Sequence, residues 1–570
     1  MAEGKTAIRT YVSPKLKVEG WDDVAHHFEE LLYRKIAKAD DLRTWLLNYS
    51  ELEAVISEES AWRYIRMTLD TRDKEASERY QHFVSDVLPK VEQWTDKLNQ
   101  RLIADPFIGQ IDGEGFPVMF RGIKGQLEIF REENVPLQAE LRSMGQEYST
   151  AIGAMSVNWN GEEITLPKAA SILESTDRGE REKVYQLIAE RRSVDRARLD
   201  ELFDRMVHKR HTVATNAGFT NFRDFMYRSL GRFDHRPEDA MAFHASVERE
   251  VLPIVAQLEE SRRESLGVER LRPWDLSVDV SGKPPLKPFS DPKQLIDLTV
   301  AVFEKLDPYF AGCIRTMEHM GRLDLASRDG KAPGGYNYPL YESGAPFIFM
   351  NAVGTSDDVI TMLHEGGHAV HSFLTHPLPL TGFKSFPSEV AELASMSMEL
   401  LTMDHWSLIY PDAEDLRRAK RDQLERVLTI LPWVATVDAF QHQIYTHPQW
   451  TADERTAEWM KVHQRFSGKI VDWTGLEHER SMLWQKQLHI FEVPFYYIEY
   501  GIAQLGAIGV WRNYKEDPIG AIRKYTDALK LGYTRTLPEI YETAGIKFDL
   551  SEEHVRELIG FVRGELDQLL

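Results

Sequence analysis

Residues 355–374 read TSDDVITMLHEGGHAVHSFL and contain the pattern His-Glu-x-x-His. The segment opens with a capping-box-like start and continues with apolar residues, so we expect a helix to about residue 374. On a helix, His364 and His368 differ by about 40° in azimuth and about 6 Å in rise, so both imidazoles can reach one metal ion. Glu365 lies in the same arc and can hold a water molecule on that metal. The pattern predicts a metal site; the alternative is a pair of core histidines on an ordinary helix.

Two adjacent glycines, Gly366 and Gly367, lie between the histidines. In a helix interior each glycine costs about 1 kcal/mol relative to alanine. We therefore expect something to pack very close to this turn, such as a neighbouring helix that carries another ligand.

A catalytic zinc ion needs a third protein ligand and an open position for water. His371 lies one turn beyond His368, but it is about 10 Å from His364 along the helix axis and cannot easily close the same site. We expect His371 on the helix face or behind the ligands, and a carboxylate further along the chain as the third ligand.

The next predicted helix, residues 387–399, reads PSEVAELASMSME and holds three acids among apolar and small residues. Acids on the inward face of an apolar helix are costly unless they are paired or bind a metal. Glu392 and Glu399 share one face, and Glu389 lies one turn earlier. We expect Glu392 to be the third ligand and Glu399 to orient a ligand histidine, although the spacing alone does not choose firmly between Glu389 and Glu392.

A second candidate site lies in residues 489–500, HIFEVPFYYIEY, and is rich in polar aromatic residues. A histidine followed by three tyrosines at a predicted helix start is unusual in one short window. For any one of these tyrosines, a place in an aromatic core is the ordinary explanation.

Composition and charge narrow the class of protein. The 570 residues include 69 basic and 90 acidic side chains, a net charge of −21, so we expect no nucleic-acid partner. Cys313 is the one cysteine, which excludes an intramolecular disulfide. Met1 to Arg9 lack the apolar core of a signal peptide, and no apolar stretch is long enough to span a membrane. We expect a cytoplasmic protein without a membrane partner; the sequence is compatible with a monomer or a homo-oligomer.

Most of the chain shows helical spacing of apolar residues, over residues 22–48, 51–70, 78–104, 178–217, 236–265, 292–321 and 414–446. Prolines in residues 267–290 make this break a candidate boundary between lobes, or a long surface loop. The one clear β signal is residues 334–351, where two aromatic-rich runs flank Ser343-Gly344 and predict a hairpin.

These motifs resemble the thimet oligopeptidase/oligoendopeptidase F family of zinc peptidases, and most of all its oligoendopeptidase F branch. The similarity extends over most of the chain and includes Gly218-Phe219, Trp274-Asp275 and the segment from Gly330 to Asn351. The resemblance implies that His364, His368 and Glu392 bind one Zn²⁺ per chain and that Glu365 is the general base.

In the family pattern, a histidine in a flexible loop precedes two tyrosines three positions apart, which matches His489, Tyr497 and Tyr500. The resemblance implies that Tyr497 and His489 stabilise the oxyanion and that Tyr500 positions the substrate. Relatives of the thimet branch carry a further loop tyrosine where this chain has Val493 or Pro494. The division of roles among the tyrosines, including Tyr496, therefore stays open.

We expect a mainly α, two-lobed helical fold that encloses a deep substrate channel, with a small β-sheet beside the active site. The expected domains are an N-terminal lobe, 1–200, and a catalytic region, 201–570, with one continuous domain as the alternative. Pro346 fits an edge strand, and a substrate peptide can add as an extra strand to an exposed edge. The residues expected to bind substrate in this way are Gly335, Tyr336, Ala345, Pro346, Phe347 and Ile348.

The expected function is that of a zinc metalloendopeptidase that hydrolyses internal bonds of short peptides, with Glu365 activating water at the zinc ion. The restriction to short peptides is implied by the enclosed channel of the family. One alternative is a zinc exopeptidase, of carboxypeptidase or aminopeptidase type, although no motif for holding a peptide terminus is visible. The other is a non-catalytic helical scaffold that binds peptides.

Overall fold

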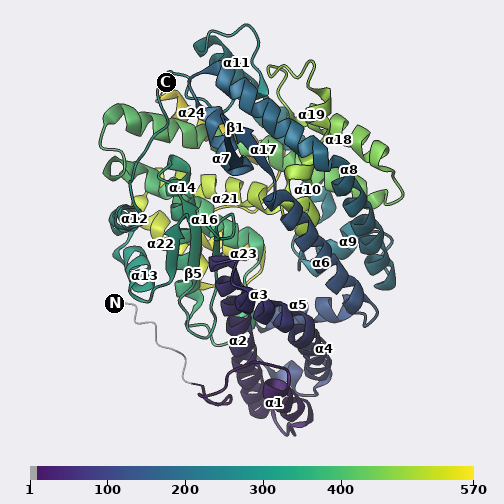
Figure 1. Ribbon diagram of the computed structural model, residues 1–570. Coiled ribbons are helices and arrows are strands. Elements are labelled where there is room, and N and C mark those ends of the chain that lie inside the picture. Colours follow the sequence, from purple (N-terminus) through teal and green to yellow (C-terminus); the bar gives the residue numbers. More distant parts are fainter. Residues whose placement is uncertain (1–8, 570) are drawn as a thin grey trace. The chain divides into compact units, whose positions relative to one another are not determined.

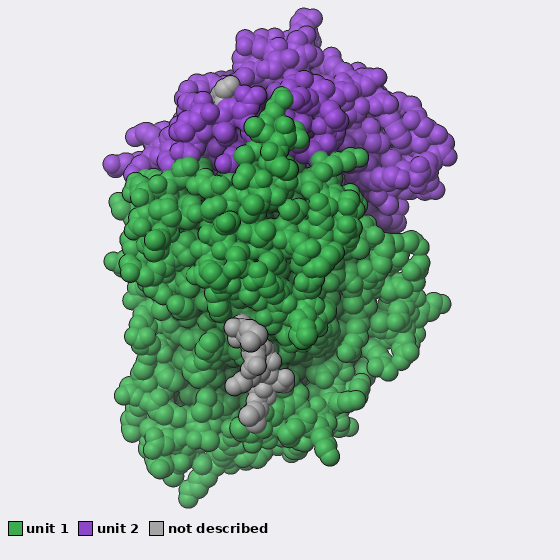
Figure 2. Space-filling model, turned by 90° about the vertical axis from the view of Figure 1, so that its left-hand side faces the viewer, with its two compact units in different colours: residues 1–132, 287–416, 506–548 green, residues 133–286, 417–505, 549–570 purple. Residues whose placement is uncertain are grey.

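The computed structural model describes residues 9–569, which are mainly helical, as predicted (Figure 1). The chain forms two compact units, each built from three segments (Figure 2). Unit 1 comprises residues 1–132, 287–416 and 506–548, and unit 2 comprises residues 133–286, 417–505 and 549–570. The chain passes from unit 2 to unit 1 within the proline-rich break predicted at 267–290.

The domain boundary expected at residue 200 and the enclosed channel stay predictions; residue 200 itself lies inside helix α8. Of the segment from Met1 to Arg9, in which we expect no signal peptide, only Arg9 belongs to the described residues. None of the helices in residues 9–569 combines the length and the apolar character needed to cross a bilayer.

Unit 1 contains most of the N-terminal helices, a three-stranded sheet and the helices that follow it. Its elements are α1 (Asp22–Tyr33), α2 (Ala39–Leu69), α3 (Lys74–His82), α4 (Leu88–Ala104), α5 (Phe116–Ile129), α12 (Pro292–Leu306), α13 (Pro308–His319), β3 (Leu323–Ala326), β4 (Tyr336–Tyr338), β5 (Phe347–Ala352), α14 (Ser356–Thr375), α15 (Thr381–Lys384), α16 (Ser388–Thr402), α22 (Pro518–Lys530) and α23 (Leu537–Thr543).

Unit 2 is built around long helices and a small hairpin. Its elements are α6 (Asn134–Gly153), β1 (Ser156–Trp159), β2 (Glu162–Thr165), α7 (Leu166–Ser171), α8 (Arg178–Asn216), α9 (Phe222–Ser229), α10 (Pro237–Ser246), α11 (Leu252–Ser265), α18 (Ala452–Phe466), α19 (Glu477–Ser481), α20 (Leu488–Glu492), α24 (Glu552–Asp567) and most of α17 (Ala413–Thr446). Helix α21 (Ile498–Glu516) begins in unit 2 and runs past its last residue in this part of the chain, Leu505.

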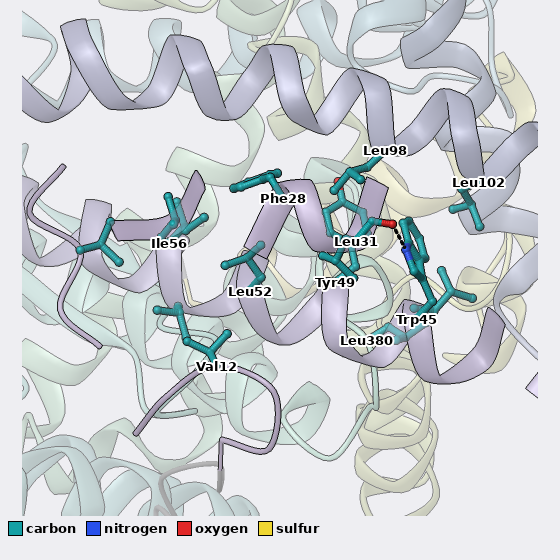
Figure 3. Close-up of a cluster of buried hydrophobic side chains, with 14 of the residues drawn as sticks. Val12, Phe28, Leu31, Trp45, Tyr49, Leu52, Ile56, Leu98, Leu102 and Leu380 are labelled. Atoms are coloured by element: carbon teal, nitrogen blue, oxygen red, sulfur yellow. Dashed lines mark hydrogen bonds between the residues drawn. The ribbon is translucent and has the colours of Figure 1, made fainter. Parts of the chain in front are cut away.

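The N-terminal helices of unit 1 share an apolar core, part of which Figure 3 shows. Trp45 of α2 is fully buried, and its indole N–H donates to the carbonyl of Leu31 in α1 at 2.8 Å. This bond satisfies the single polar atom of a buried tryptophan. Leu380 and Phe383 pack into the same core, which fixes the connection between α14 and α16 to the N-terminal helices.

The three-stranded sheet has the order β3-β5-β4. Strand β4 pairs antiparallel with β5, with Tyr336 opposite Phe349 and Tyr338 opposite Phe347, which confirms the predicted hairpin. Strand β3 pairs in parallel with the other side of β5. The expectation that the strand around Ala345–Met350 lies at an edge is therefore wrong, because residues 323–326, which were not expected to be a strand, cover it. The outer positions in the order fall to β3 and β4.

The helix boundaries differ from the predicted ones where the apolar spacing continues across a break. Residues 34–38 interrupt the predicted helix 22–48, whereas α2 continues through the predicted break at 49–50. Pro308 begins α13 and divides the predicted helix 292–321, because proline is favoured in the first turn of a helix. The predicted helices 178–217 and 414–446 are confirmed as α8 and α17.

Candidate metal centre

Helix α14 starts with the capping box that the sequence predicts. The hydroxyl of Thr355 accepts a hydrogen bond from the Asp358 backbone N–H at 3.2 Å, and the Asp358 carboxylate accepts one from the Thr355 N–H at 2.9 Å. These two bonds satisfy backbone donors that the first turn of a helix leaves unpaired. They fix the start of the helix that carries His364, Glu365 and His368.

The two glycines of α14 lie where neighbouring helices approach, as predicted; Figure 1 shows α14 next to α16. A β-carbon on Gly367 would lie 2.7 Å from the Cα of Ser395 and 2.8 Å from the carbonyl oxygen of Ala394, both in α16. A β-carbon on Gly366 would lie 2.7 Å from the ring of Phe303 in α12. Gly367 thus allows the backbone of the acid-bearing helix to touch the backbone of the histidine helix, and Gly366 leaves room for the ring of Phe303.

This contact brings Glu392 of α16 to the two histidines of α14. Nε2 of His364 lies 3.3 Å from the Glu392 carboxylate, and Nε2 of His368 lies 3.8 Å from it. One ligand atom from each of the three residues lies within 4.8 Å of the other two. Within residues 9–569, no other group of three His, Cys, Asp or Glu side chains meets this condition. Two imidazoles and one carboxylate form a donor set that suits zinc.

Glu399 contacts the opposite side of the first histidine. Nδ1 of His364 donates to the Glu399 carboxylate at 2.7 Å, which leaves Nε2 directed toward Glu392. Burial by itself lowers the pKa of His364, but the hydrogen bonds that its ring donates to Glu392 and Glu399 outweigh this effect and hold the pKa well above the ordinary value. Burial lowers the pKa of His368 to about 4, although Glu392 opposes that shift. The structure thus places Glu399 where the sequence expects it.

Glu365 lies in the same group and is buried. Burial, together with the charges of Glu392 and Glu399, raises its pKa to about 7, against the opposing effect of His364. Its Oε2 atom is buried and has no hydrogen-bond partner in the described part of the chain. Three carboxylates meet only two imidazoles here, so a divalent cation would balance their charge. The residues present fit a zinc ion.

The two residues that competed for the role of third ligand lie outside this group. Glu389 is buried one turn earlier in α16, and its backbone carbonyl accepts a hydrogen bond from Tyr541. His371 is fully buried, and its ring stacks on Phe386 with 3.6 Å between the ring centres. Geometry therefore groups Glu392, and neither Glu389 nor His371, with the histidines.

The polar aromatic residues predicted at 489–500 form one cluster in unit 2. His489 belongs to α20, and its ring centre lies 4.8 Å from that of Tyr497 and 5.7 Å from that of Tyr500. Nε2 of His489 lies 3.4 Å from the Tyr500 hydroxyl. Tyr497 is buried directly before α21, and burial raises its pKa to about 12. Its phenol therefore stays protonated near neutral pH and is able to donate a hydrogen bond.

Three further polar residues contact these sites and were not predicted. The amide of Asn337 in β4 donates to the backbone carbonyl of Glu365 at 3.1 Å, which ties the edge strand to α14. In unit 2 the indole N–H of Trp433 donates to Gln487 at 3.0 Å, and the Gln487 amide lies 2.8 Å from Nδ1 of His489. For Gln487, its position two residues before His489 was a usable signal. No local pattern identifies Asn337 or Trp433.

The residues expected to bind substrate divide into two groups. Ala345, Pro346, Phe347 and Ile348 are buried at or in the central strand β5, so they do not offer a free strand edge. Gly335 and Tyr336 lie at the start of the edge strand β4. Tyr336 is half-buried, and its hydroxyl lies 2.6 Å from Thr68 of α2.

Comparison with known proteins identifies the family of the chain. The model of peptidase family M3 matches residues 171–559, and that of the peptidase M3 N-terminal domain matches residues 15–130. An oligoendopeptidase F homolog of Lactococcus lactis subsp. lactis (strain IL1403) is 22% identical over 419 residues, which cover 68% of this chain and 64% of that protein. Oligopeptidase PepF of Bacillus subtilis (strain 168) is 21% identical over 468 residues, covering 78% and 68% of the two chains. The chain therefore spans slightly less than two thirds of the Lactococcus relative.

Solved structures show the same fold. The chain matches a structure of PZ peptidase A with an inhibitor at 27% identity and a TM-score of 0.92, covering 98% of this chain and 99% of the other. It matches oligoendopeptidase-F from Enterococcus faecium at 16% identity and a TM-score of 0.65, covering 96% and 97%. The resemblance predicted from the sequence is confirmed: the chain belongs to peptidase family M3, a family of metallopeptidases.

Proposed function

We propose that this enzyme is a zinc-dependent endopeptidase that hydrolyses internal bonds of short peptides. The observation that carries the proposal is the convergence of donor atoms from His364, His368 and Glu392 within 4.8 Å of one another. The imidazole and carboxylate donors are those that catalytic zinc sites use, and such sites leave a further position for water or substrate. Family membership and the names of the two bacterial relatives support the same reaction.

In this proposal His364, His368 and Glu392 hold the zinc ion, and Glu399 fixes the ring of His364 through Nδ1. A zinc ion bound there polarises a carbonyl group and lowers the pKa of water. Glu365 accepts the proton of the attacking water at its carboxylate and passes it to the leaving amine. Its buried Oε2 atom, which has no hydrogen-bond partner among residues 9–569, suits a group that accepts a proton from water.

We assign stabilisation of the oxyanion to Tyr497, with His489 as a second candidate, and positioning of the substrate to Tyr500. The match to the family pattern supports these roles, as does the contact of all three rings in one cluster. A protonated phenol donates to an oxygen that becomes negative in the transition state. Because the three side chains contact one another, each requires its own substitution to separate the roles.

For substrate binding, we propose that a peptide adds as an extra strand beside β4, and not beside the central strand β5. Gly335 and Tyr336 lie at the edge of the sheet, and Asn337 joins this edge to the backbone of Glu365. A peptide that pairs with β4 would be held by backbone hydrogen bonds and would tolerate many side chains.

Two measurements on one preparation test the proposed function: bound metal per chain, and cleavage of a fluorogenic peptide blocked at both ends. We expect one zinc ion per chain and cleavage that a chelator abolishes and added zinc restores. Cleavage of peptides only when one end is free would indicate an exopeptidase. Absence of both bound metal and cleavage would indicate a scaffold.

We also propose a cytoplasmic location, with which a chain that has one cysteine and thus no intramolecular disulfide is compatible. Fractionation of the source cells, with detection by an antibody, tests this part of the proposal.

A further inference from the structure

Two basic side chains of unit 2, Arg192 in α8 and Lys486 at the end of the 3₁₀-helix Leu483–Lys486, lack a carboxylate partner in the described part of the chain. Their neighbours are paired: Arg191 with Asp195 at 2.5 Å, and Arg196 with Asp200 at 3.8 Å.

Contacts between α8 and the 3₁₀-helix place these two cations near each other. The side chain of Gln485 donates to the carbonyl of Arg196 at 3.3 Å and to the carboxylate of Asp200 at 2.7 Å. Arg192 lies one turn before Arg196, so both lie on the same face of α8. Arg192 also acts electrostatically on Lys486, which follows Gln485 directly.

Lys486 also lies close to the aromatic residues that we propose to act in catalysis. Nζ of Lys486 lies 5.1 Å from the centre of the Trp433 ring. Trp433 in turn hydrogen-bonds Gln487, and it opposes the rise in pKa that burial causes at Tyr497. Gln487 contacts His489. Lys486 is therefore connected to Tyr497 through Trp433, and to His489 through Trp433 and Gln487.

Bringing the two cations together without an anion is unfavourable. Lys486 is exposed to solvent, yet the nearby protein and, to a smaller extent, the charge of Arg192 lower its pKa to about 8. Burial also lowers the pKa of the half-buried Arg192. An anion between them would remove this repulsion, and a carboxylate matches the fork of N–H donors on a guanidinium.

We propose that Arg192 and Lys486 bind a carboxylate group of the peptide substrate. This inference rests on the proposed function, because the ligand is a peptide held beside His489 and Tyr497. The carboxylate comes either from the C-terminus of a short peptide or from an Asp or Glu side chain. In the first case the site would also provide the terminus-binding group for which the sequence shows no motif.

The test uses the zinc-loaded enzyme and three fluorogenic peptides that share one sequence and an acetylated N-terminus. The first ends in a free carboxylate, the second ends in an amide, and the third ends in an amide and carries Glu in place of one Gln. We expect kcat/KM to be roughly 10- to 100-fold higher for a carboxylate peptide than for the amide, mainly through KM. Preference for the first or the third peptide identifies the source of the carboxylate.

The variants Arg192→Met and Lys486→Met should lose this preference, so that each variant cleaves the carboxylate and the amide peptides with equal kcat/KM. Lys486→Arg should retain the preference, because it keeps the charge. Lys461→Met is the matched control, since Lys461 is an exposed lysine of unit 2 that pairs with Glu458; it should change nothing. A merely structural role for Lys486 would lower cleavage of all three peptides equally.

The inference is overturned if the native enzyme cleaves carboxylate and amide peptides equally well, or if both methionine variants keep the preference. Failure of the native enzyme to cleave either of the two amide peptides, which are blocked at both ends, would contradict the proposed function instead. In that event, fluorescence anisotropy of the same labelled peptides decides on the anion site, with tighter binding of the carboxylate forms as the supporting result and equal binding as the refuting one.

Discussion

Gly367 of α14 lies against Ser395 of α16 so closely that a β-carbon at position 367 would come within 2.7 Å of the Ser395 Cα atom. The atom in the way belongs to the backbone, so no side-chain rotation relieves the clash. We expect Gly367→Ala to push α16 away, to lower the stability by about 1–3 kcal/mol and to weaken zinc binding, because Glu392 lies on the displaced helix. Thermal unfolding and zinc titration measure the two effects.

Gly312→Ala is the matched control for that variant. Gly312 lies in α13, also in unit 1, and a β-carbon there meets no atom within 4 Å. Alanine is favoured over glycine in a helix by about 1 kcal/mol, so this variant should be as stable as the native protein or slightly more stable. Equal melting temperatures and zinc affinities for the two variants would show that the contact between α14 and α16 does not position Glu392.

Glu392→Ala should weaken zinc binding far more than Glu389→Ala. Both residues are buried in α16, but only Glu392 has a carboxylate within 4.8 Å of the ligand atoms of both histidines. We expect Glu392→Ala to lose more zinc affinity than the roughly 10–100-fold that is typical when a residue that hydrogen-bonds a metal ligand is replaced. Zinc titration against a chromophoric chelator measures both. Equal losses, or a larger loss for Glu389→Ala, would refute the ligand assignment.

Tyr497→Phe should lower kcat by about 10²–10³, which is the effect of removing one donor to an oxyanion. KM should change little, because the phenol is proposed to interact with an oxygen that becomes charged only in the transition state. If Tyr497 has only a structural role, the variant will instead change the melting temperature and keep its kcat. Steady-state kinetics and a melting curve on one preparation distinguish these outcomes, and Tyr496→Phe serves as the neighbouring control.

His463 should make the protein sensitive to mild acid. Burial lowers its pKa to about 3, and Arg480 and Lys486 add to the shift; Arg480 also donates to Nδ1 of His463 at 3.0 Å. Because the unfolded chain binds the proton more readily, the stability that the neutral ring confers is present above about pH 6.5 and is lost as the pH falls toward 3. By pH 5.5 the loss should reach about 1.4 kcal/mol.

His463→Gln tests this, because glutamine can still accept from Arg480 but does not titrate. Urea unfolding at pH 7.5 and 5.5 should show an acid-induced loss about 1.4 kcal/mol smaller in the variant than in the native protein. His319→Gln, at an exposed position of α13, is the control and should behave as the native protein does. A variant with the native acid sensitivity would contradict the assignment.

The metal centre was predictable because its residues follow local rules. The helical period alone places His364 and His368 on one face, and the paired glycines indicate a close neighbour before its identity is known. The choice of Glu392 over Glu389 needed the family resemblance, because it depends on how α16 is rotated against α14. That rotation is set by contacts such as Gly367 with Ser395, which no local pattern encodes.

The errors have an equally physical origin. The strand around Phe347 was assigned to the edge of the sheet on the basis of Pro346 alone. Its parallel partner β3 has four residues, which is too short to be recognised as a strand from the sequence. The hairpin of β1 and β2 was missed although Asn160-Gly161, with positive φ at both residues, is a typical two-residue hairpin turn. Arg192 and Lys486 are far apart in the chain. They come near each other only because α8 packs on the 3₁₀-helix Leu483–Lys486, and no local sequence pattern indicates this.

The most direct test of the account compares the native enzyme with Glu365→Gln in zinc content and in cleavage of a peptide blocked at both ends. The amide keeps the shape of the side chain and leaves all three proposed ligands in place, but it cannot take up the proton of water. We expect one zinc ion per chain in both proteins, with cleavage by the native enzyme alone. Near-native turnover by the variant, or cleavage by the native enzyme without bound metal, would contradict the account.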